Sequence, residues 1–314
     1  MKFGCILPQR SSDFSIIREV ALECERLGFD SIWTNDHLYP YEGPVSGPFY
    51  DAWTPLCALA TVTSKIRLGP FVLVDSFRYP SIVAKETSAL DQVSGGRVEV
   101  GLGAGWWKEE FDAYGIPFID AETRIAALRE GIQIIKKMWT EEKTTFRGKY
   151  HSVESVYNNP KPVQKPHPPL WVAGADRRVM KVAAEFADVW DLGFYPSNTP
   201  EGYRKKVKAL ERCCRDIGRN PDGLCKSWHG EIVIAGTESE LRRRVAQLRT
   251  AGGLQAGEPI DVARIIGTPD QCAKQIERLA EYGASYIMIR FDEMEKIEPL
   301  KLFAEEVMPR FRGT

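Results

Sequence analysis

The chain has 314 residues, of which 43% are apolar and 27% are charged, and its 42 lysines and arginines are balanced by 43 aspartates and glutamates. This length and composition exclude a small module and a membrane-embedded protein, and the near-zero net charge excludes a global basic field that would collect nucleic acid or anionic lipid. Pro8, Gln9 and Arg10 interrupt the amino terminus before a signal-peptide core could form, so we expect a cytoplasmic protein that binds small molecules.

Short β-rich runs alternate with amphipathic helices along the whole chain. In chain order the expected strands read KFGCIL, FDSIW, IRLGPFVLV, RVEVGLG, PLWVAG, ADVWDL, GEIVIAG and ASYIMIR. Several of them are apolar on both faces, which is typical of parallel strands that crossover helices cover. Eight strand and helix units can close on themselves, so we expect an α/β fold in which residues 1–314 form a single (β/α)8 TIM barrel domain. An open doubly wound sheet is the alternative.

Glycines and hydroxyl side chains mark where the predicted helices end and begin. Gly28 ends the first helix, and Gly218 ends a later one that begins at Thr199 and Pro200. Thr268 and Gln271 have the spacing of a capping box, in which each side chain binds the other residue's backbone N–H.

Three segments are longer than connections between barrel elements usually are, and we expect insertions near 38–53, 143–168 and 252–267. The middle one is rich in proline and predicts a short hairpin followed by an extended strap. Long loops of compact domains usually carry function.

The seven cysteines include no C-x-x-C pair and predict reduced, mostly buried thiols, with a reactive thiol or a structural zinc as the alternative. The four histidines are scattered, and no metal-binding motif or G-x-S-x-G elbow occurs, so we expect no metal. Glu109 and Glu110 could suggest glycoside cleavage, but neighbours on a helix point about 100° apart.

The active site of a parallel barrel lies where its strands end, and the second strand ends in Asn35, Asp36 and His37. A histidine beside a carboxylate at that position is a candidate acid, base or hydrogen-bond donor to a cofactor. Alternatively, Asp36 and His37 only hold their own loop in place.

The fourth strand ends in the glycine-rich run GLGAGWW, which lacks the G-x-G-x-x-G spacing of a dinucleotide site. We interpret Gly101, Gly103 and Gly105 as positions that let a flat ring approach the backbone, with Trp106 and Trp107 closing the site. The glycines could instead only ease a tight turn, and Trp107 could be part of the core.

Two further strand ends carry groups that could bind an anion. Gly174 and Ala175 precede a helix whose free N–H groups suit an anion. Arg290 ends the eighth strand, where it faces either an anionic ligand or a surface carboxylate such as Asp292. Arg78, beyond the third strand, has the same two interpretations.

These segments together resemble the luciferase-like monooxygenase superfamily, and within it the branch of oxidoreductases that depend on coenzyme F420. The resemblance runs almost from end to end, through GFDSIWTNDHLYP, SKIRLGPFVLVDSFRYPSIVAKETSALDQVSGGRVEVGLGAGWWKEEFDAYGIPF, KPVQKPHPPLWVAG, GTPDQCAKQIERLAEYGASYIMIRFDE and EEVMPRF.

The resemblance implies a barrel with a flavin or deazaflavin across the carboxyl ends of its strands. It implies that Asp36 and His37 lie under the ring and that a bulge with a non-prolyl cis peptide bond lies at Phe71 and Val72. The remaining implied cofactor contacts are Ala104, Gly105 and Trp106 on the fourth strand, and Gly174 and Ala175 at the phosphate end. Homodimers are common in the family, so a homodimer is expected.

The chain departs from the family's sugar-phosphate dehydrogenases at Trp106, which stands where those enzymes have an acidic residue. A sugar-phosphate substrate is therefore not expected, and the proton donor is expected to be His37 first and Glu109 second. Tyr39, Tyr41 and Phe49 on the first long loop favour a small apolar or aromatic substrate.

The resulting hypothesis is an F420-dependent oxidoreductase that transfers a hydride between the cofactor and that substrate. One alternative is an FMN-dependent luciferase-like monooxygenase that uses O2, and another is a flavin- or deazaflavin-binding protein without catalysis.

Overall fold

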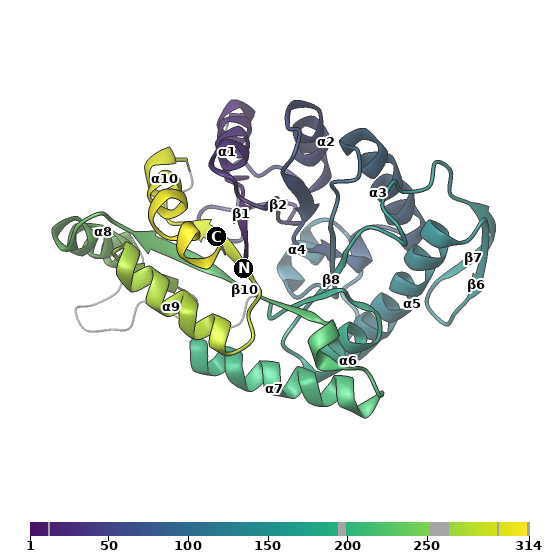
Figure 1. The fold of residues 1–314 in the computed structure, drawn as a ribbon. Coiled ribbons are helices and arrows are strands. Elements are labelled where there is room, and N and C mark those ends of the chain that lie inside the picture. The colour runs from purple at the N-terminus through teal and green to yellow at the C-terminus, as the bar shows by residue number, and fades with distance from the viewer. Residues whose placement is uncertain (12, 194–198, 252–263, 294, 313–314) are drawn as a thin grey trace.

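A computed structural model describes residues 1–11, 13–193, 199–251, 264–293 and 295–312, in which parallel strands form a central ring surrounded by helices (Figure 1). The strands of the ring are β1 Lys2–Ile6, β2 Ser31–Thr34, β3 Arg67–Pro70, β4 Leu73–Val74, β5 Val100–Gly103, β8 Leu170–Ala173, β9 Val189–Asp191, β10 Cys225–Ile234 and β12 Tyr286–Phe291.

The hydrogen-bonded order of these strands is β3-β2-β1-β12-β10-β9-β8-β5-β4, and every neighbouring pair is parallel. β3 and β4 together occupy one position of the ring, since only the bulge at Phe71 and Val72 separates them. A parallel bridge between Leu68 and Val98 joins β3 to the residues before β5 and brings the two ends of the order together. The (β/α)8 barrel is therefore confirmed, and the open doubly wound sheet is wrong.

Large side chains fill the inside of the ring. Trp33, Phe71, Trp171, Tyr286 and Met288 belong to one buried cluster, and the rings of Trp33 and Trp171 lie 4.7 Å apart. A Cβ atom at Gly4 would come within 2.6 Å of the Met288 sulfur, so this packing leaves no space for a side chain there. The filled interior forms a floor beneath the open end of the barrel.

The helices that cover the ring begin and end close to the predicted positions. Gly28 has the left-handed φ of 81° that ends α1, Thr199 accepts the Gly202 N–H at 3.0 Å, and Thr268 and Gln271 form the capping box. The helices are α1 Phe14–Leu27, α2 Trp53–Val62, α3 Pro80–Ser94, α4 Lys108–Ala113, α5 Ala121–Thr140, α6 Arg177–Phe186, α7 Pro200–Asp216, α8 Glu238–Ala251, α9 Pro269–Glu281 and α10 Ile297–Glu306. Short 3-10 turns are η1 Asp75–Phe77, η2 Pro221–Gly223 and η3 Met308–Phe311.

Residues 143–168 begin with the antiparallel hairpin of β6 Lys143–Arg147 and β7 Ser152–Tyr157, which lies at the outer edge of the molecule beside α5 (Figure 1). The strap that follows contains cis bonds before Pro160 and Pro166. Residues 38–52 connect β2 to α2 without a helix or strand.

Of the expected insertion at 252–267, residues 252–263 lie outside the described residues, and the rest form β11 Arg264–Gly267. β11 pairs with the end of β10, at Glu231–Ile234, which lies beyond the part of β10 that pairs with β9. The end of β10, β11 and α8 enclose a small core of their own, formed by Val233, Ala235, Leu241, Val245, Leu248 and Ile266.

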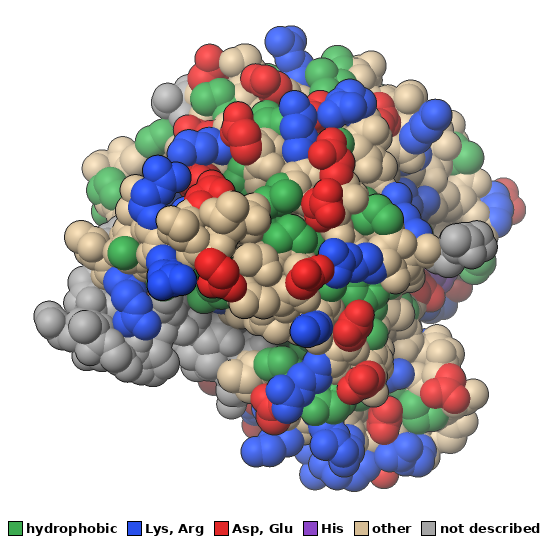
Figure 2. All heavy atoms as spheres, turned by 60° about the vertical axis from the view of Figure 1, so that its left-hand side comes forward, with side chains coloured by type: hydrophobic (Ala, Val, Ile, Leu, Met, Phe, Trp, Pro, Cys, Tyr) green, Lys and Arg blue, Asp and Glu red, His purple; other side chains and the backbone are tan. Residues whose placement is uncertain are grey.

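Basic and acidic side chains are intermixed on the face shown in Figure 2, as the near-zero net charge leads one to expect. All seven cysteines are unpaired, and only Cys57 and Cys225 are not buried. Within the described residues, none of the helices has the length and apolarity needed to cross a membrane.

Candidate active site

A cavity of about 930 Å³ opens where the barrel strands end. Residues at or just after the ends of β1, β2, β4, β5, β8, β9 and β12 line it, together with His229, Gly230 and Glu231 of β10. Its volume lies within the range of about 300–1,000 Å³ that is usual for pockets that bury a small ligand. The place is the one that the barrel architecture predicts for chemistry.

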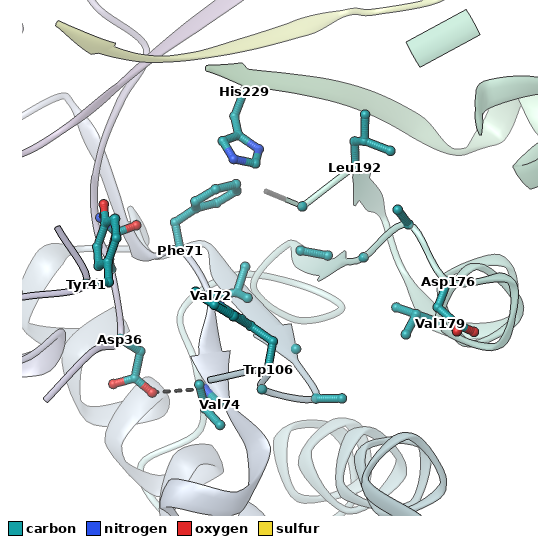
Figure 3. Close-up of a pocket in the computed structure, with 18 of the residues that line it drawn as sticks. Asp36, Tyr41, Phe71, Val72, Val74, Trp106, Asp176, Val179, Leu192 and His229 are labelled. Atoms are coloured by element: carbon teal, nitrogen blue, oxygen red, sulfur yellow. Dashed lines mark hydrogen bonds between the residues drawn. The ribbon is translucent and has the colours of Figure 1, made fainter. Parts of the chain in front are cut away.

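The residues that the resemblance assigned to a cofactor all line this one cavity. They are Asp36, His37, Phe71, Val72, Ala104, Gly105, Trp106, Gly174 and Ala175. Figure 3 shows Phe71, Val72 and Trp106 in the middle of the cavity, with Asp36 and Tyr41 at one end and Asp176 and Val179 at the other. The peptide bond between Phe71 and Val72 is cis, as the resemblance implied.

Asp36 is buried and connects the end of β2 to β4. Its carboxylate accepts the Val74 N–H at 2.9 Å, drawn as a dashed line in Figure 3, and two contacts of 2.8 and 2.9 Å from the Arg78 guanidinium. Burial raises the pKa of Asp36, and the charge of Arg78 offsets part of that increase. Of the two interpretations of Arg78, the structure supports an ion pair, with a cavity residue as its partner.

His37 is held by a carboxylate from another element. Its Nδ1 lies 3.0 and 3.2 Å from the two carboxylate oxygens of Glu110 on α4, and the Leu38 N–H donates to Glu110 Oε1 at 2.6 Å. Glu110 is only 1% exposed. The aromatic rings of Tyr41, Trp106 and Trp107 surround the imidazole, with centroids 4.7 to 6.1 Å away.

Glu109 takes no part in this arrangement. It is exposed on α4 and is not among the residues that line the cavity. Helical geometry turns Glu110 inward and Glu109 outward, so the glutamate that contacts His37 is Glu110. Trp106 lines the cavity but is 61% exposed, and its indole stacks on that of Trp107.

A second histidine lines the cavity and was not predicted. His229 lies over Phe71, with ring centroids 5.1 Å apart (Figure 3), and its Nδ1 is 2.8 Å from the buried carboxylate of Asp191. Asp191 also accepts hydrogen bonds from the Ser227 hydroxyl and from the Gly193 N–H. The apolar run GEIVIAG predicts a seventh strand that starts just after His229, whereas β10 begins at Cys225 and includes His229.

Arg290 belongs to a saturated ionic cluster at one end of the cavity. Its two terminal nitrogens contact both carboxylate oxygens of Glu42 at 2.8 and 3.0 Å, the Tyr41 hydroxyl at 3.0 Å and the carboxylate of Glu231. Arg264 and Arg10 pair with the same two glutamates. These pairs raise the pKa of Arg290 despite its burial. In this structure Arg290 therefore pairs with Glu42 and Glu231 rather than with Asp292.

The other end of the cavity carries cations near the start of α6. Arg177 and Lys206 line it together with Gly174 and Ala175. The Arg177 side chain is 73% exposed, and its nearest carboxylate, Asp216, is 3.9 Å away. Asp176 also lines this end, and its carboxylate accepts the Arg178 N–H at 2.8 Å and pairs with the Arg178 guanidinium. Positive charge at a helix start suits a phosphate.

The residues present fit a flavin or deazaflavin. Gly103, Ala104 and Gly105 keep one wall of the cavity thin, and a Cβ at Gly105 would strike Val74 and Phe111 at 2.8 and 2.9 Å. The guanidinium of Arg124 donates to the carbonyl of Ala104 at 3.1 Å and so holds this wall in place. A flat apolar floor, a thin wall and a cationic end match a planar ring with an anionic tail. Within the described ranges, no three His, Cys, Asp or Glu side chains gather as metal ligands would.

Comparisons with known proteins agree with this geometry. The family profile described as luciferase-like monooxygenase matches residues 1–286. The F420-dependent glucose-6-phosphate dehydrogenase of Kineococcus radiotolerans is 34% identical over 319 residues, which cover 94% of this chain and 93% of the relative. The FMNH(2)-dependent dimethylsulfone monooxygenase of Pseudomonas putida is 25% identical over 336 residues, with 98% and 90% covered.

Among solved structures, the coenzyme F420 dependent tetrahydromethanopterin reductase from Methanopyrus kandleri matches with a TM-score of 0.81 at 22% identity, over 99% of both chains. That similarity supports the fold. The two relatives at the sequence level are named for different cofactors, F420 and reduced FMN.

Proposed function

Since the chain belongs to the luciferase-like monooxygenase family, we propose that it is an oxidoreductase that transfers a hydride between coenzyme F420 and a small apolar or aromatic substrate. The observation that carries this proposal is the single cavity lined by every residue assigned to the cofactor. The 34% identity to an F420-dependent dehydrogenase, against 25% to an FMNH(2)-dependent monooxygenase, favours F420.

In this proposal the bulge at Phe71 and Val72 supports the ring, and Ala104, Gly105 and Trp106 face it from the adjacent strand. Gly174, Ala175, Arg177 and Lys206 hold the anionic tail. The protein orients the ring and the substrate and excludes water around them. Asp36 acts from beneath by fixing Val74, just after the bulge.

When bound in its reduced form, the cofactor would supply a hydride, which is two electrons and one proton, to an electrophilic carbon of the acceptor. The heteroatom of the acceptor then needs a proton, and we assign its donation to Nε2 of His37. In the opposite direction the same nitrogen takes the proton from a substrate hydroxyl or amine.

The surroundings of His37 support an uncharged substrate. Tyr41, Trp106 and Trp107 present aromatic ring surfaces beside the imidazole. The terminal nitrogens of Arg290 already contact Glu42, Glu231 and Tyr41. A phosphate on the substrate would have to compete with two carboxylates for that arginine. This argues against a sugar phosphate, although the relative from Kineococcus radiotolerans is named for glucose-6-phosphate.

Two other functions remain candidates. An FMN-dependent monooxygenase would use the same cavity and is favoured by the relative from Pseudomonas putida. A flavin- or deazaflavin-binding protein without catalysis would also need the cavity but not His37. The homodimer and the cytoplasmic location stay predictions.

The test compares F420 and FMN on the purified protein. We expect F420 to bind more tightly by fluorescence titration, and reduced F420 to be consumed by aromatic carbonyl or enone acceptors without O2. Turnover should fall by about 100-fold in His37→Ala. Tighter binding of FMN with consumption of O2 would replace the proposal by the monooxygenase, and binding without turnover of any acceptor would favour the non-catalytic protein.

A further inference from the structure

Among the residues that the structure describes, the buried carboxylate of Glu110 has two hydrogen-bond partners, and both belong to the loop that carries His37. One is the Leu38 N–H, which donates to Oε1 at 2.6 Å, and the other is Nδ1 of His37, 3.0 Å from Oε2. Glu110 comes from α4, 72 residues farther along the chain than Leu38. This contact therefore fixes the His37 ring relative to a different wall of the cavity.

The contact also determines which imidazole nitrogen carries the proton. An ionised carboxylate only accepts hydrogen bonds, so Nδ1 of His37 must be the N–H donor when the ring is neutral. Nε2 then carries the lone pair and gains a proton only when the ring becomes cationic. Among the described residues, none makes a hydrogen bond to this Nε2, and His37 lines the cavity.

The same carboxylate stabilises the cationic ring once Nε2 is protonated. Because Glu110 is 1% exposed, water screens little of the attraction between its carboxylate and an imidazolium 3.0 Å away. The His37 ring can thus accept a proton at Nε2 and donate it to the substrate without rotating away from Glu110.

We infer that Glu110 is the positioning residue of this site: it fixes the tautomer and orientation of His37, so that Nε2 exchanges a proton with the substrate. This inference rests on the proposed function for its catalytic part, whereas its structural part concerns the His37 ring alone. The assignment gives the reaction a carboxylate that acts through the histidine. Trp106 stands in this chain where the resemblance places the acidic residue of the family's sugar-phosphate dehydrogenases.

The variant Glu110→Gln tests this role with little change in packing. Its amide oxygen can still accept the Leu38 N–H, while its amide NH2 faces Nδ1 and donates to it. The neutral His37 ring should then switch to the tautomer with the proton on Nε2. Asp112→Asn, an exposed carboxylate on the same helix that pairs with Lys108, is the matched control.

Nitrogen-15 NMR of histidine-labelled protein, without cofactor, reads this tautomer directly, with the His37 signals assigned by their loss in His37→Ala. We expect the Nδ1–H form in the wild-type protein and in Asp112→Asn, and the Nε2–H form in Glu110→Gln. An Nε2–H tautomer in the wild-type protein, or no change in Glu110→Gln, would overturn the inference.

Kinetics with the best acceptor tests the catalytic part. We expect kcat of Glu110→Gln to fall by about 100-fold while KM changes by less than about threefold, because the substrate still binds but proton transfer fails. Equal losses in Asp112→Asn, or a loss confined to KM, would contradict it. If the protein binds cofactor but turns over nothing, the proposed function fails, while the NMR result still decides whether Glu110 sets the tautomer.

Discussion

The side chains around the cavity hold one another as much as they would hold a ligand. Asp36 pairs with Arg78, Glu110 with His37, and Asp191 with His229, and each of these carboxylates is buried. A buried carboxylate is stable only when such donors surround it. The residues that shape the site are therefore also residues on which folding depends.

Asp36→Ala should destabilise the folded protein. It leaves the Arg78 guanidinium and the Val74 N–H without their acceptor, and we expect the free energy of unfolding to fall by about 3 kcal/mol. Urea unfolding followed by circular dichroism measures the change. Cofactor affinity should fall as well, since Val74 lies only two residues beyond the bulge.

Glu185→Ala is the control for Asp36, because it removes an exposed partner of Arg129 at the surface of α6. Exposed pairs contribute little, so this variant should unfold like the wild-type protein. An equal loss of unfolding free energy in the two variants would show that the buried contacts of Asp36 do not stabilise the protein more than an exposed ion pair does.

Asp75 gives a prediction about pH. Burial raises its pKa above the ordinary 3.8, and the hydrogen bond with His151 offsets only part of this increase. The folded protein thus holds the proton more tightly than the unfolded chain does. The stability contributed by this proton is complete below the unfolded pKa and is lost as pH rises through the folded one.

Asp75→Asn keeps the shape of the side chain and removes the titration. Relative to the wild-type protein, this variant should gain in free energy of unfolding as the pH is raised from about 4 to about 6. Urea unfolding at several pH values measures the difference. A difference that stays constant, or that shrinks with rising pH, would show that the pKa of Asp75 is not raised.

Residue types at strand ends were predictable, but their partners were not. Asp36, His37 and Gly105 could be found because each follows a recognisable strand. The inward turn of Glu110 and the approach of Asp191 to His229 depend on how α4, β9 and β10 pack, and no local pattern records that. Arg290 could be placed at the rim, yet its pairing with Glu42 joins residues 248 positions apart.

At the scale of elements, the turn between β6 and β7 is bound through three backbone N–H groups to one side chain of α5. Glu130 on α5 accepts the N–H groups of Lys149, Tyr150 and His151 at 2.8 to 2.9 Å. Burial alone would raise the pKa of Glu130, but these three donors hold it below its ordinary value. The turn of the hairpin is thus bound to a carboxylate that stays ionised under mild acid.

Glu130→Ala should loosen that turn without unfolding the barrel. We expect the amides of residues 149–151 to exchange with deuterium about tenfold faster, since each loses its acceptor. Hydrogen exchange by mass spectrometry or NMR measures it. Glu154→Ala removes an exposed pair with Arg147 on the same hairpin and should leave those amides unchanged. Equal acceleration in both would argue against fastening by Glu130.

The order of the elements was predictable because apolar runs and capping residues repeat through the chain. The lengths of the strands were less predictable than their order. The bulge divides the third predicted strand into β3 and β4, and β10 begins five residues before the expected GEIVIAG. Both deviations arise from pairing with neighbouring strands, which a single sequence does not display.

At the scale of the whole molecule, the first and last elements close the ring together. β1 pairs with β12, the amino-terminal nitrogen donates to the Phe311 carbonyl at 3.2 Å, and the two termini lie close together in Figure 1. Phe3, Phe29 and Phe291 pack around Phe303 of α10. The closing strand and this helix lie almost wholly beyond the residues matched by the family profile.

Phe303→Ala should therefore weaken the whole barrel. Removing a fully buried ring at the junction of the first and last strands is expected to cost about 3–5 kcal/mol. The melting temperature and the urea midpoint should fall together, in a single transition. Lys301→Ala, an exposed position on the same helix, should change neither, and a local rather than global loss in Phe303→Ala would contradict the role given to α10.

β10 is the longest of the described strands, and its two halves pair with different neighbours. Its first residues pair with β9, Glu231 and Ile232 still pair with β12 of the ring, and Val233 packs with residues of β11 and α8 in a separate small core. Glu231 in the second half of β10 and Arg264 of β11 form an ion pair, and both residues line the cavity. Among the described strands β11 pairs with β10 alone, so substitution of Arg264 is expected to change the lining of the cavity while leaving the pairing of the ring strands intact.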